Sequence, residues 1–350
     1  MDNQSNVIEN IKTYYGKTLQ NKNDLKTSAC CTDQKIPDHL KGLMGNIHDD
    51  IVSKFYGCGS PIPPLLTGAT VLDLGCGTGL DCYLASQLVG ENGRVIGVDM
   101  TKEQISIAQN YEEYQKVKFG YKKKNTEFHL GYIEDLDSIG VADDSVDVVI
   151  SNCVINLTSD KRKVFSEIFR VLKPGGELYF SDVFCDRRIP KELMDDPLLL
   201  GECLSGAMYI EDFRRMLKDL NINDYRVVTE SPFEVNDADI RNKLGMVKFN
   251  SMTLRTFKCD FEDICENYGH VAYYQGGIHE YPNNFILDDH HQFEKGFPIP
   301  VCGNTSKMIG ESRFREHFLL VGDFSSHYGE FSCDLISNGK YDNPSSGSCC

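Results

Sequence analysis

The segment Val71–Cys82 reads VLDLGCGTGLDC and decides the fold. It begins as a short apolar run, turns through Gly75, Gly77 and Gly79, and then predicts a helix from about Leu80. Glycine lets the backbone approach a ligand where a Cβ atom would clash, and the first turn of a helix offers free N–H groups. A strand, a glycine turn and a helix in this order therefore predict a seat for a nucleotide.

The next segment, Arg94–Met100, reads RVIGVDM and predicts a second strand that ends in Asp99. An acid at the end of the second strand is placed to bind the two hydroxyls of a ribose. Leu80 stands where a dinucleotide fingerprint carries its third glycine, which favours one nucleoside with a short tail. Asp73 suits a tail with an ammonium group. S-adenosylmethionine (SAM) has both features and is the predicted cofactor, and the alternative is a glycine turn without a ligand.

The composition limits the class of partner. The chain has 350 residues, and 36 Lys and Arg against 52 Asp and Glu give a net charge of −16. Nucleic acid is therefore excluded as the main partner, because no basic excess is present to neutralise phosphates. No signal peptide is expected, and no apolar run approaches the roughly twenty residues that cross a bilayer. We expect a cytoplasmic protein without membrane contact, and a monomer because no long heptad repeat is present.

Strands and helix-length segments alternate from residue 69 onward. The predicted strands are 71–74, 95–99, 126–130, 146–151 and 177–183, followed by a closing and possibly antiparallel pair at 225–229 and 252–257. One helix is predicted over 101–114, and Ser159 is the predicted cap of the helix before the turn at residues 174–176. This alternation predicts an α/β fold with a parallel, doubly wound sheet, whose ligand lies at the carboxyl ends of the strands.

The chain contains 14 cysteines, which are informative in a reducing compartment. Cys153 follows the fourth strand, Cys203 lies between two glycines, Cys58 lies in a turn before the first strand, and Cys30 lies near the N-terminus. None of them belongs to a C-x-x-C pair, but thiolates from distant positions can converge on a soft ion. Trivalent arsenic held by three sulfurs keeps a lone pair that can attack a sulfonium methyl group. A methyl donor beside thiols therefore suggests arsenic methylation, which needs orientation more than a general base.

The chain resembles the SAM-dependent arsenite methyltransferases over roughly residues 10–320. The blocks that carry the resemblance are TYYGKTLQNKNDLKTSAC, FYGCG, VLDLGCGTGLDCY, VIGVDMTKEQ, GYIEDL, ISNCVINL, RVLKPGGELYFSDV and GECLSGAM, with weaker matches at YYQGGI, FEKG and SRFREHF. GYIEDL, SNCVINL and GECLSGA are the most specific of these, because any class I methyltransferase can carry the glycine turn.

The resemblance implies which cysteines act. The catalytic set is Cys30, Cys58, Cys153 and Cys203, of which the last three would ligate As(III). Cys30 and Cys58 would close a disulfide during turnover, to be reopened by a thioredoxin-like reductant, and Cys31 could stand in for Cys30. The products implied are mono- and dimethylated arsenic, with glutathione or another thiol delivering As(III).

The resemblance also implies the cofactor contacts. They are Tyr56, Gly75, Gly77, Asp99, Met100, Gln104, Ile133, Glu134 and Asn152, and the sequence pattern adds Asp73. Two alternatives stay open: a soft-ion or redox sensor on a methyltransferase fold, and a methyltransferase for another soft acceptor such as selenium or tellurium species. Cys76 and Cys82 are predicted to be structural, and His290 and His291 to be an exposed pair in a turn.

Four regions are expected. Residues 1–68 form an N-terminal helical segment with a helix over 38–55, and 69–258 form the class I SAM-dependent methyltransferase core with a Rossmann-like sheet and the arsenic site. Residues 259–333 form a smaller α+β domain, with short strands at 270–274, 285–287 and 318–321. Residues 334–350 form a disordered tail that ends in two cysteines.

Overall fold

The computed structural model describes residue 12 and residues 37–54, 57, 61–194 and 196–332. The predicted functional residues Cys30, Tyr56 and Cys58 and the predicted tail 334–350 lie outside the described residues. Among the described residues, no helix combines the length and the apolar character that a membrane span requires.

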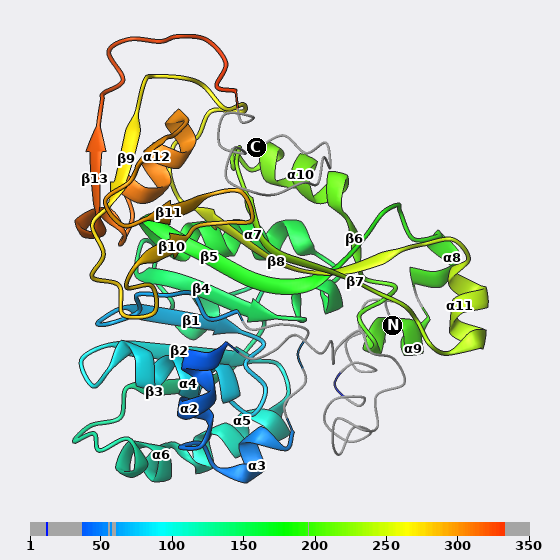
Figure 1. Ribbon diagram of the computed structural model, residues 1–350. Helices are drawn as coiled ribbons and strands as arrows, with labels where there is room; N and C mark the ends of the chain where they lie inside the picture. The colour runs from blue at the N-terminus through cyan, green and yellow to red at the C-terminus, as the bar shows by residue number, and fades with distance from the viewer. Residues whose placement is uncertain (1–11, 13–36, 55–56, 58–60, 195, 333–350) are drawn as a thin grey trace.

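A central sheet of eight strands organises the chain (Figure 1). Its order is β3-β2-β1-β4-β5-β8-β7, with β6 beside β5. The strands are β1 Thr70–Leu74, β2 Arg94–Asp99, β3 Thr126–Leu130, β4 Val146–Asn152, β5 Leu172–Cys185, β6 Met208–Tyr209, β7 Arg226–Phe233 and β8 Phe249–Phe257. The first six run parallel, and β8 is antiparallel to both β5 and β7. The predicted doubly wound class I fold and its closing antiparallel pair are confirmed.

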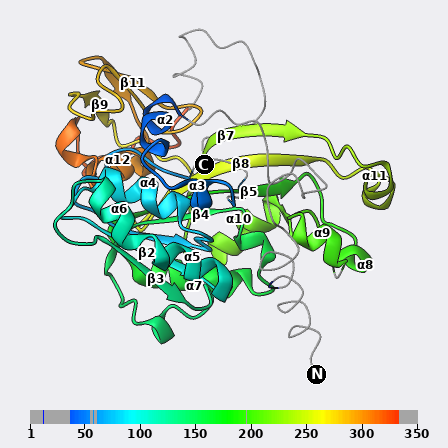
Figure 2. The same ribbon diagram turned by 90° about the horizontal axis from the view of Figure 1, so that it is seen from below.

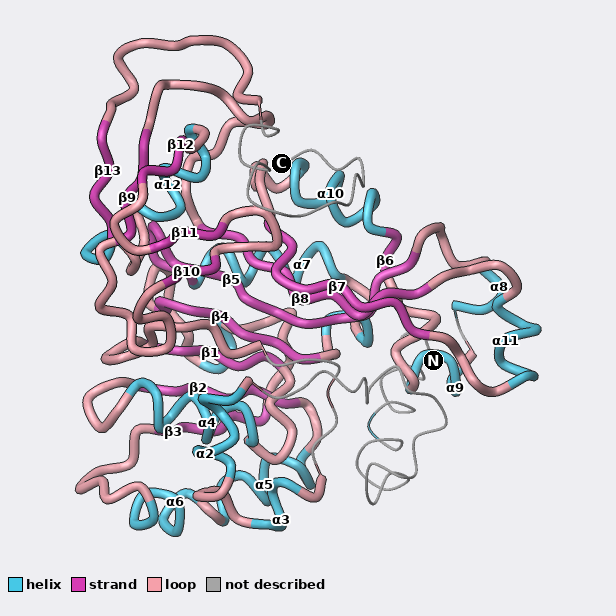
Figure 3. The backbone as a smooth tube through the Cα atoms, viewed as in Figure 1, coloured by secondary structure: helices cyan, strands magenta, loops and turns pink. Residues whose placement is uncertain are grey.

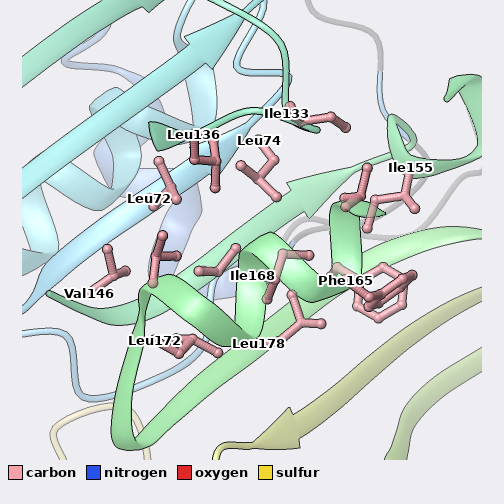
Figure 4. Close-up of a cluster of buried hydrophobic side chains, with 14 of the residues drawn as sticks. Leu72, Leu74, Ile133, Leu136, Val146, Ile155, Phe165, Ile168, Leu172 and Leu178 are labelled. Atoms are coloured by element: carbon pink, nitrogen blue, oxygen red, sulfur yellow. The ribbon is translucent and has the colours of Figure 1, made fainter. Parts of the chain in front are cut away.

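Helices cover both faces of this sheet. On one face, α2 (Asp38–Met44), α4 (Leu80–Val89) and α5 (Lys102–Asn110) contribute to one buried apolar cluster. On the other face, α7 (Lys161–Val171) and α10 (Ile210–Asp219) contribute to a second one, and Figure 4 shows Phe165 and Ile168 of α7 among the side chains of β1, β4 and β5. The apolar residues of α7 recur at helical spacing, so that they form the stripe that faces the sheet.

Several predicted helix boundaries are wrong. Asp160, not Ser159, caps α7, because its Oδ1 accepts a hydrogen bond from the Lys163 N–H at 3.0 Å. The predicted helix over 38–55 is two helices, α2 and α3 (Asp49–Val52), because α2 ends at Gly45. The segment predicted as one helix after β2 is likewise divided into α5 and α6 (Glu112–Lys118).

Strand β5 is longer than predicted, because the segment predicted as a turn belongs to the strand. The strand begins at Leu172 and continues through Gly175 and Gly176. A register shift between Val146 and Val148 of β4 accommodates this segment. Gly175 has φ +74°, and a Cβ atom there would lie 2.0 Å from the Glu311 carbonyl oxygen, so that only glycine fits.

The C-terminal unit forms two small sheets and one helix. Its elements are β9 Val271–Tyr274, β10 Asn284–Ile286, β11 Gln292–Glu294, β12 Pro298–Pro300, α12 Gly303–Gly310, the 3-10 turn η5 Arg315–His317 and β13 Phe318–Val321. The order β12-β9-β13 forms one sheet, and β10-β11 forms the other. Rings of Tyr274, Phe285, Phe293, Phe314 and Phe318 make its core. The predicted strands near 270–274, 285–287 and 318–321 are confirmed, whereas β11, β12 and α12 were not predicted.

The two ends of the sheet carry different structures. The C-terminal unit lies at one end and α8 (Lys191–Met194), α9 (Pro197–Gly201) and α11 (Ala238–Leu244) lie at the other, as both views show (Figures 1 and 2). Arg313 donates hydrogen bonds to the carbonyls of Pro64 and Leu65, which places the C-terminal unit at the amino end of β1. Figure 3 shows β5, β7 and β8 continuing past the neighbouring strands toward the other end.

Candidate functional site

The glycine turn between β1 and α4 has the backbone that its sequence predicts. Gly75, Gly77 and Gly79 have φ values of +74°, +53° and +90°, in the left-handed region that favours glycine. A Cβ atom on Gly75 would lie 2.4 Å from the Val154 side chain, and one on Gly79 would lie 2.9 Å from Phe128. Nothing lies within 4 Å of the corresponding position on Gly77. The turn is therefore closed on two sides and open beside its middle glycine.

Asp99 ends β2 and holds this turn in place. Its Oδ2 accepts a hydrogen bond from the Gly77 N–H at 2.9 Å, and its Oδ1 accepts one from the Thr101 N–H at 2.8 Å. Burial raises the pKa of Asp99, and the two N–H donors oppose that rise. The carboxylate lies where a ribose contact was predicted, and that role stays a prediction.

Asp73, Asp81 and Asp99 form a cluster of carboxylates around the turn. Asp73 is 2% exposed and Asp81 is 6% exposed. Burial, followed by the nearby charge of Asp81, raises the pKa of Asp73 well above its ordinary value, and burial raises the pKa of Asp81 to about 6. Among the described residues, none of the three forms a salt bridge with a cationic side chain. Buried acids without a counterion suit a ligand that brings a positive charge, as the ammonium and sulfonium of SAM would.

The other predicted cofactor residues come from neighbouring strand ends. Met100 follows β2, Gln104 lies in the first turn of α5, Ile133 and Glu134 follow β3, and Asn152 ends β4. Because these elements are adjacent and parallel, their carboxyl ends meet at one edge of the sheet. The structure thus brings the described members of the predicted set to one side.

Asp81 belongs to this site although it was not predicted. Its Oδ2 accepts a hydrogen bond from the Asn152 amide at 3.1 Å and so fixes one of the predicted cofactor residues. The partners are 71 residues apart in the sequence, which is why no local pattern shows the contact. The one available signal was the acid that follows the glycine turn in GLDC.

Cys153 and Cys203 lie together at the end of β4. Both are buried, and both have positive φ values, 56° and 59°, which is uncommon for residues other than glycine. The Cys203 Sγ donates to the Cys153 carbonyl at 3.4 Å. The two cysteines share an apolar cluster with side chains of β5, α9 and α11. A left-handed backbone conformation is strained for a cysteine, and strain of this kind concentrates at functional sites.

The sulfur of Cys153 is joined in a disulfide. The six described cysteines without a disulfide are Cys76, Cys82, Cys185, Cys203, Cys259 and Cys302, so the partner of Cys153 lies outside them. The turnover disulfide implied by the family resemblance joins Cys30 and Cys58, and both of those residues lie outside the described part of the chain. Cys153 is therefore in an oxidised form here and needs reduction before it can bind a soft ion.

The glycine turn touches the turn that carries the cysteines. Val154, whose side chain closes the space beside Gly75, follows Cys153 directly. The glycine turn and the Cys153 turn are therefore neighbours in space.

A buried polar network lies behind the cysteine turns and was not predicted. It consists of Asn156 in the 3-10 turn η4 (Ile155–Leu157), Asp182 in β5 and Lys161 at the start of α7. Burial raises the pKa of Asp182 to about 7, against the backbone N–H donors of Val183 and Asn156, and lowers the pKa of Lys161. The ISNCVINL block contained the only signal, a second asparagine without a predicted role.

Cys76 and Cys82 are buried, as expected of structural cysteines. Both sulfurs pack against Gly97, where a Cβ atom would lie 2.8 Å from each. Burial raises the pKa of Cys76 to about 11 and that of Cys82 well above its ordinary value. Both therefore stay neutral thiols at neutral pH.

Of the two histidines that were predicted to be exposed, only one is exposed. His290 is exposed, but His291 is 1% exposed and its Nδ1 lies 2.8 Å from the Asp288 carboxylate. The prediction was wrong for His291, because Asp288, three residues earlier, offers a buried partner within the same turn. Asp288, Asp289 and His290 could together offer ligands to a cation, and exposed acidic groups are common without one.

Two family models match the chain. A methyltransferase domain matches residues 65–221, and an arsenite methyltransferase C-terminal domain matches residues 268–344. The first covers the glycine turn, Asp99 and both described cysteines of the site. The second covers most of the C-terminal unit.

Two relatives that match about nine tenths of this chain are both named arsenite methyltransferase. An arsenite methyltransferase of Aquipseudomonas alcaligenes is 49% identical over 324 residues, which are 92% of this chain and 93% of that protein. The Homo sapiens arsenite methyltransferase is 38% identical over 315 residues, 90% of this chain and 84% of that protein. The crystal structure of an arsenic(III) SAM methyltransferase from Chlamydomonas reinhardtii matches with a TM-score of 0.83 and 45% identity, over 85% of this chain and all of that one.

Proposed function

The chain belongs to the arsenite methyltransferase family and is a SAM-dependent arsenite methyltransferase, and from this premise we propose how it holds and methylates its substrate. Trivalent arsenic is bound by the sulfurs of Cys58, Cys153 and Cys203, and is delivered as a complex with glutathione or another thiol. The single observation that supports the proposal is the packing of Gly75 on Val154, by which the glycine turn lies beside the residue that follows Cys153.

The residues divide into a cofactor side and a substrate side. Asp99 binds the ribose, the acids Asp73 and Asp81 offset the positive charge of the cofactor, and Tyr56, Gly75, Gly77, Met100, Gln104, Ile133, Glu134 and Asn152 complete the seat. SAM supplies an activated methyl group on a positively charged sulfur. The cysteine sulfurs would hold the arsenic so that its lone pair is available to that carbon, and the carbon–arsenic bond would form as the carbon–sulfur bond breaks. The chain's part is to orient the arsenic and to exclude water.

Methyl transfer formally oxidises arsenic by two electrons, so each further methylation requires two electrons in return. Cys30 and Cys58 supply them by closing a disulfide, and a thioredoxin-like dithiol reopens it. The disulfide at Cys153 is a different bond, and it too has to be reduced before Cys153 can bind arsenic, because a sulfur in a disulfide offers no thiolate. Mono- and dimethylated arsenic are the proposed products. The protein acts as a cytoplasmic monomer whose regions are 1–68, 69–258, 259–333 and 334–350.

The test is a methyl-transfer assay with purified full-length protein, SAM, As(III) and glutathione, with and without thioredoxin, in which the arsenic species are resolved over time. Cys203→Ser should lower the rate by about 100-fold, since it removes a soft ligand. Cys185→Ser is the matched control. Its thiol lies in the same apolar cluster, donates to the Ala207 carbonyl at 3.4 Å, and has a pKa raised by burial to about 12.

The outcomes separate the candidate functions. Methylated arsenic that disappears in Cys203→Ser but not in Cys185→Ser would support the proposal. Equal loss in both variants would contradict the role of the cysteine pair. Bound SAM and bound As(III) without product, even with thioredoxin, would indicate a sensor, and faster turnover of selenite or tellurite would indicate another soft acceptor.

A further inference from the structure

The cysteine turns rest on a polar scaffold whose centre is Asn156. This residue and Asp182 are both fully buried, at 0% exposure. Asn156 lies three residues after Cys153, and Asp182 lies on the neighbouring strand β5. Buried polar groups are costly to fold unless they are satisfied, so a network here has a reason to be present.

Asn156 fastens the Cys153 turn to strand β5. Its side-chain amide donates to Asp182 Oδ1 at 2.7 Å and to the Val183 carbonyl at 2.6 Å. Its backbone N–H donates to Asp182 Oδ2 at 3.1 Å. The carboxylate of Asp182 thus receives both the backbone and the side chain of the same residue. Such a double attachment fixes the position of η4 and of the chain just before it.

The carbonyl of Asn156 faces the second cysteine turn. A Cβ atom on Gly206, three residues after Cys203, would lie 2.0 Å from the Asn156 oxygen. Only glycine permits so close an approach. The Lys161 ammonium donates to the same oxygen at 3.3 Å and to the Thr158 carbonyl at 2.9 Å. Both cysteine turns therefore meet at one residue, with the half-buried ammonium of Lys161 behind it.

The backbone of each cysteine requires such support. A residue other than glycine in the left-handed region costs on the order of 1 kcal/mol or more and persists only where its surroundings impose it. Cys153 and Cys203 both have this conformation. The hydrogen bond from the Cys153 N–H to the Ser181 carbonyl, at 2.8 Å, continues the attachment to β5 immediately before Asp182.

We propose that Asn156, held by Asp182, is a positioning residue that sets the separation of the Cys153 and Cys203 sulfurs at which one arsenic atom binds both. The inference rests on the proposed function and deepens it. Two sulfurs that ligate one ion must be held to about 0.5 Å, and this precision comes from the groups that fix the ligands. Asn156 acts only through the two cysteines and contacts neither substrate nor cofactor.

The experiment measures arsenical binding apart from methyl transfer. Phenylarsine oxide, whose arsenic takes two thiolates, is titrated into the full-length protein after reduction with a phosphine, which does not compete as a dithiol. The part of the phenylarsine oxide binding that is lost in Cys203→Ser is taken as binding at Cys153 and Cys203. Asn156→Ala should weaken this binding by about 10- to 100-fold, as loss of a group that orients ligands does, and should leave SAM affinity within about twofold. Asp182→Asn should have a smaller effect of the same kind, because it keeps one acceptor.

Asn125→Ala is the matched control. Asn125 is also a buried amide, 7% exposed, and donates to the carbonyls of Ser86 and Gly90 at 3.1 and 2.9 Å, away from both cysteines. Its substitution should lower the melting temperature about as much as Asn156→Ala without changing affinity for the arsenical. If Asn156→Ala lost only thermal stability, the role would be structural and the inference overturned. If Asn156→Ala did not fold, the affinities of Asp182→Asn for phenylarsine oxide and for SAM would decide the question in its place.

The test also separates this inference from the proposed function. Phenylarsine oxide binding requires no turnover. A wild-type protein that binds it through Cys203, loses that binding in Asn156→Ala, and yet methylates no arsenic would contradict the proposed function and support the positioning role. A protein that methylates arsenic normally in Asn156→Ala, with unchanged affinity, would contradict the positioning role alone.

Discussion

At the amino ends of the strands Glu177 lies between two arginines, whereas at the carboxyl ends Asp73, Asp81 and Asp99 lie together without one. Arg255 Nε donates to Glu177 Oε1 at 2.6 Å, and Arg313 Nη1 lies 2.5 Å from Glu177 Oε2. No described cation pairs with the acids at the other end. Glu177, Asp73 and Asp81 are all buried, so the two ends do not differ in the solvent exposure of these acids.

A second cluster at the amino ends also places an arginine among its acids, although burial still raises the pKa of Asp224 there. Arg226 donates to Asp224 at 2.8 Å and lies 3.7 Å from Asp288, which also contacts His291. Burial would raise the pKa of Asp288, but His291 and Arg226 hold it below its ordinary value. Burial likewise raises the pKa of Asp73, where no cation opposes it. At the amino ends the paired charges join two parts of the fold, whereas the acids at the glycine turn lie where we propose that the cationic cofactor binds.

The largest expected effect is at the balanced end. Glu177→Ala leaves Arg255 without its carboxylate partner and should lower the free energy of unfolding by about 3–5 kcal/mol. Chemical denaturation of the full chain measures it. Glu127→Ala is the control, because Glu127 pairs with Arg94 on the surface at 2.8 Å and should cost at most about 1 kcal/mol. SAM affinity of the folded fraction should not change, and a loss as small as the control's would break the comparison.

At the unbalanced end the same kind of change should impair binding instead. Asp99→Ala removes the acceptor of the Gly77 and Thr101 N–H groups and the predicted ribose ligand. SAM affinity should fall by about 100-fold, or ~2.8 kcal/mol, since hydrogen bonds to a charged group contribute about 1.5–3 kcal/mol each. Calorimetric titration measures it. Phenylarsine oxide binding should stay within about twofold, and an equal loss there would show that the two sites are not separable.

The smallest effect expected is a pH dependence. The pKa of Asp81 is about 6 in the fold, above its ordinary value of 3.8. Below pH 3.8 the carboxyl is neutral in both folded and unfolded chains, and its stabilising contribution is full; it is lost as the pH rises through 6. Asp81→Asn abolishes this titration and should therefore gain about 2 kcal/mol over the wild type between about pH 4 and 7.

The measurement is the difference in unfolding free energy between Asp81→Asn and the wild type at each pH, without SAM. The difference cancels the carboxylates whose pKa does not depend on Asp81. Asp73 is not one of them, because the charge of Asp81 raises its pKa. The substituted amide keeps an oxygen that can accept from Asn152, so the change removes the titration and not the hydrogen bond. A constant difference across this range would mean that Asp81 titrates normally in the fold, and the contrast with the balanced end would then be weaker.

Sequence patterns predicted the features that depend on neighbours in the chain. The glycine turn and Asp99 follow from short segments, and so does the parallel pairing of the strands, because connections of helix length impose it. The cap of α7 was predicted wrongly, since Ser159 and Asp160 are both good cap residues and only the contact with the Lys163 N–H decides between them.

Features that depend on distant contacts were not predicted. Glu177 and Arg313 belong to separate units, and no sequence pattern near either residue predicts their contact. Asn156 was visible in a specific block, but its contacts depend on Asp182. The left-handed backbone of Cys153 and Cys203 also has no sequence signal, because cysteine has no preference for it. The role of these two cysteines as arsenic ligands follows from the family resemblance and stays a prediction.

The contact between Glu177 and Arg313 has a consequence for how the protein is made. Synthesis proceeds from the N-terminus, so strand β5 leaves the ribosome long before Arg313 does. Until then the Glu177 carboxylate lacks one of its two arginines, and the carbonyls of Pro64 and Leu65 lack the donor that covers them. The methyltransferase core therefore gains these contacts only after the C-terminal unit has been synthesised, and a nascent chain that stalls before Arg313 should be a substrate for chaperones and proteases.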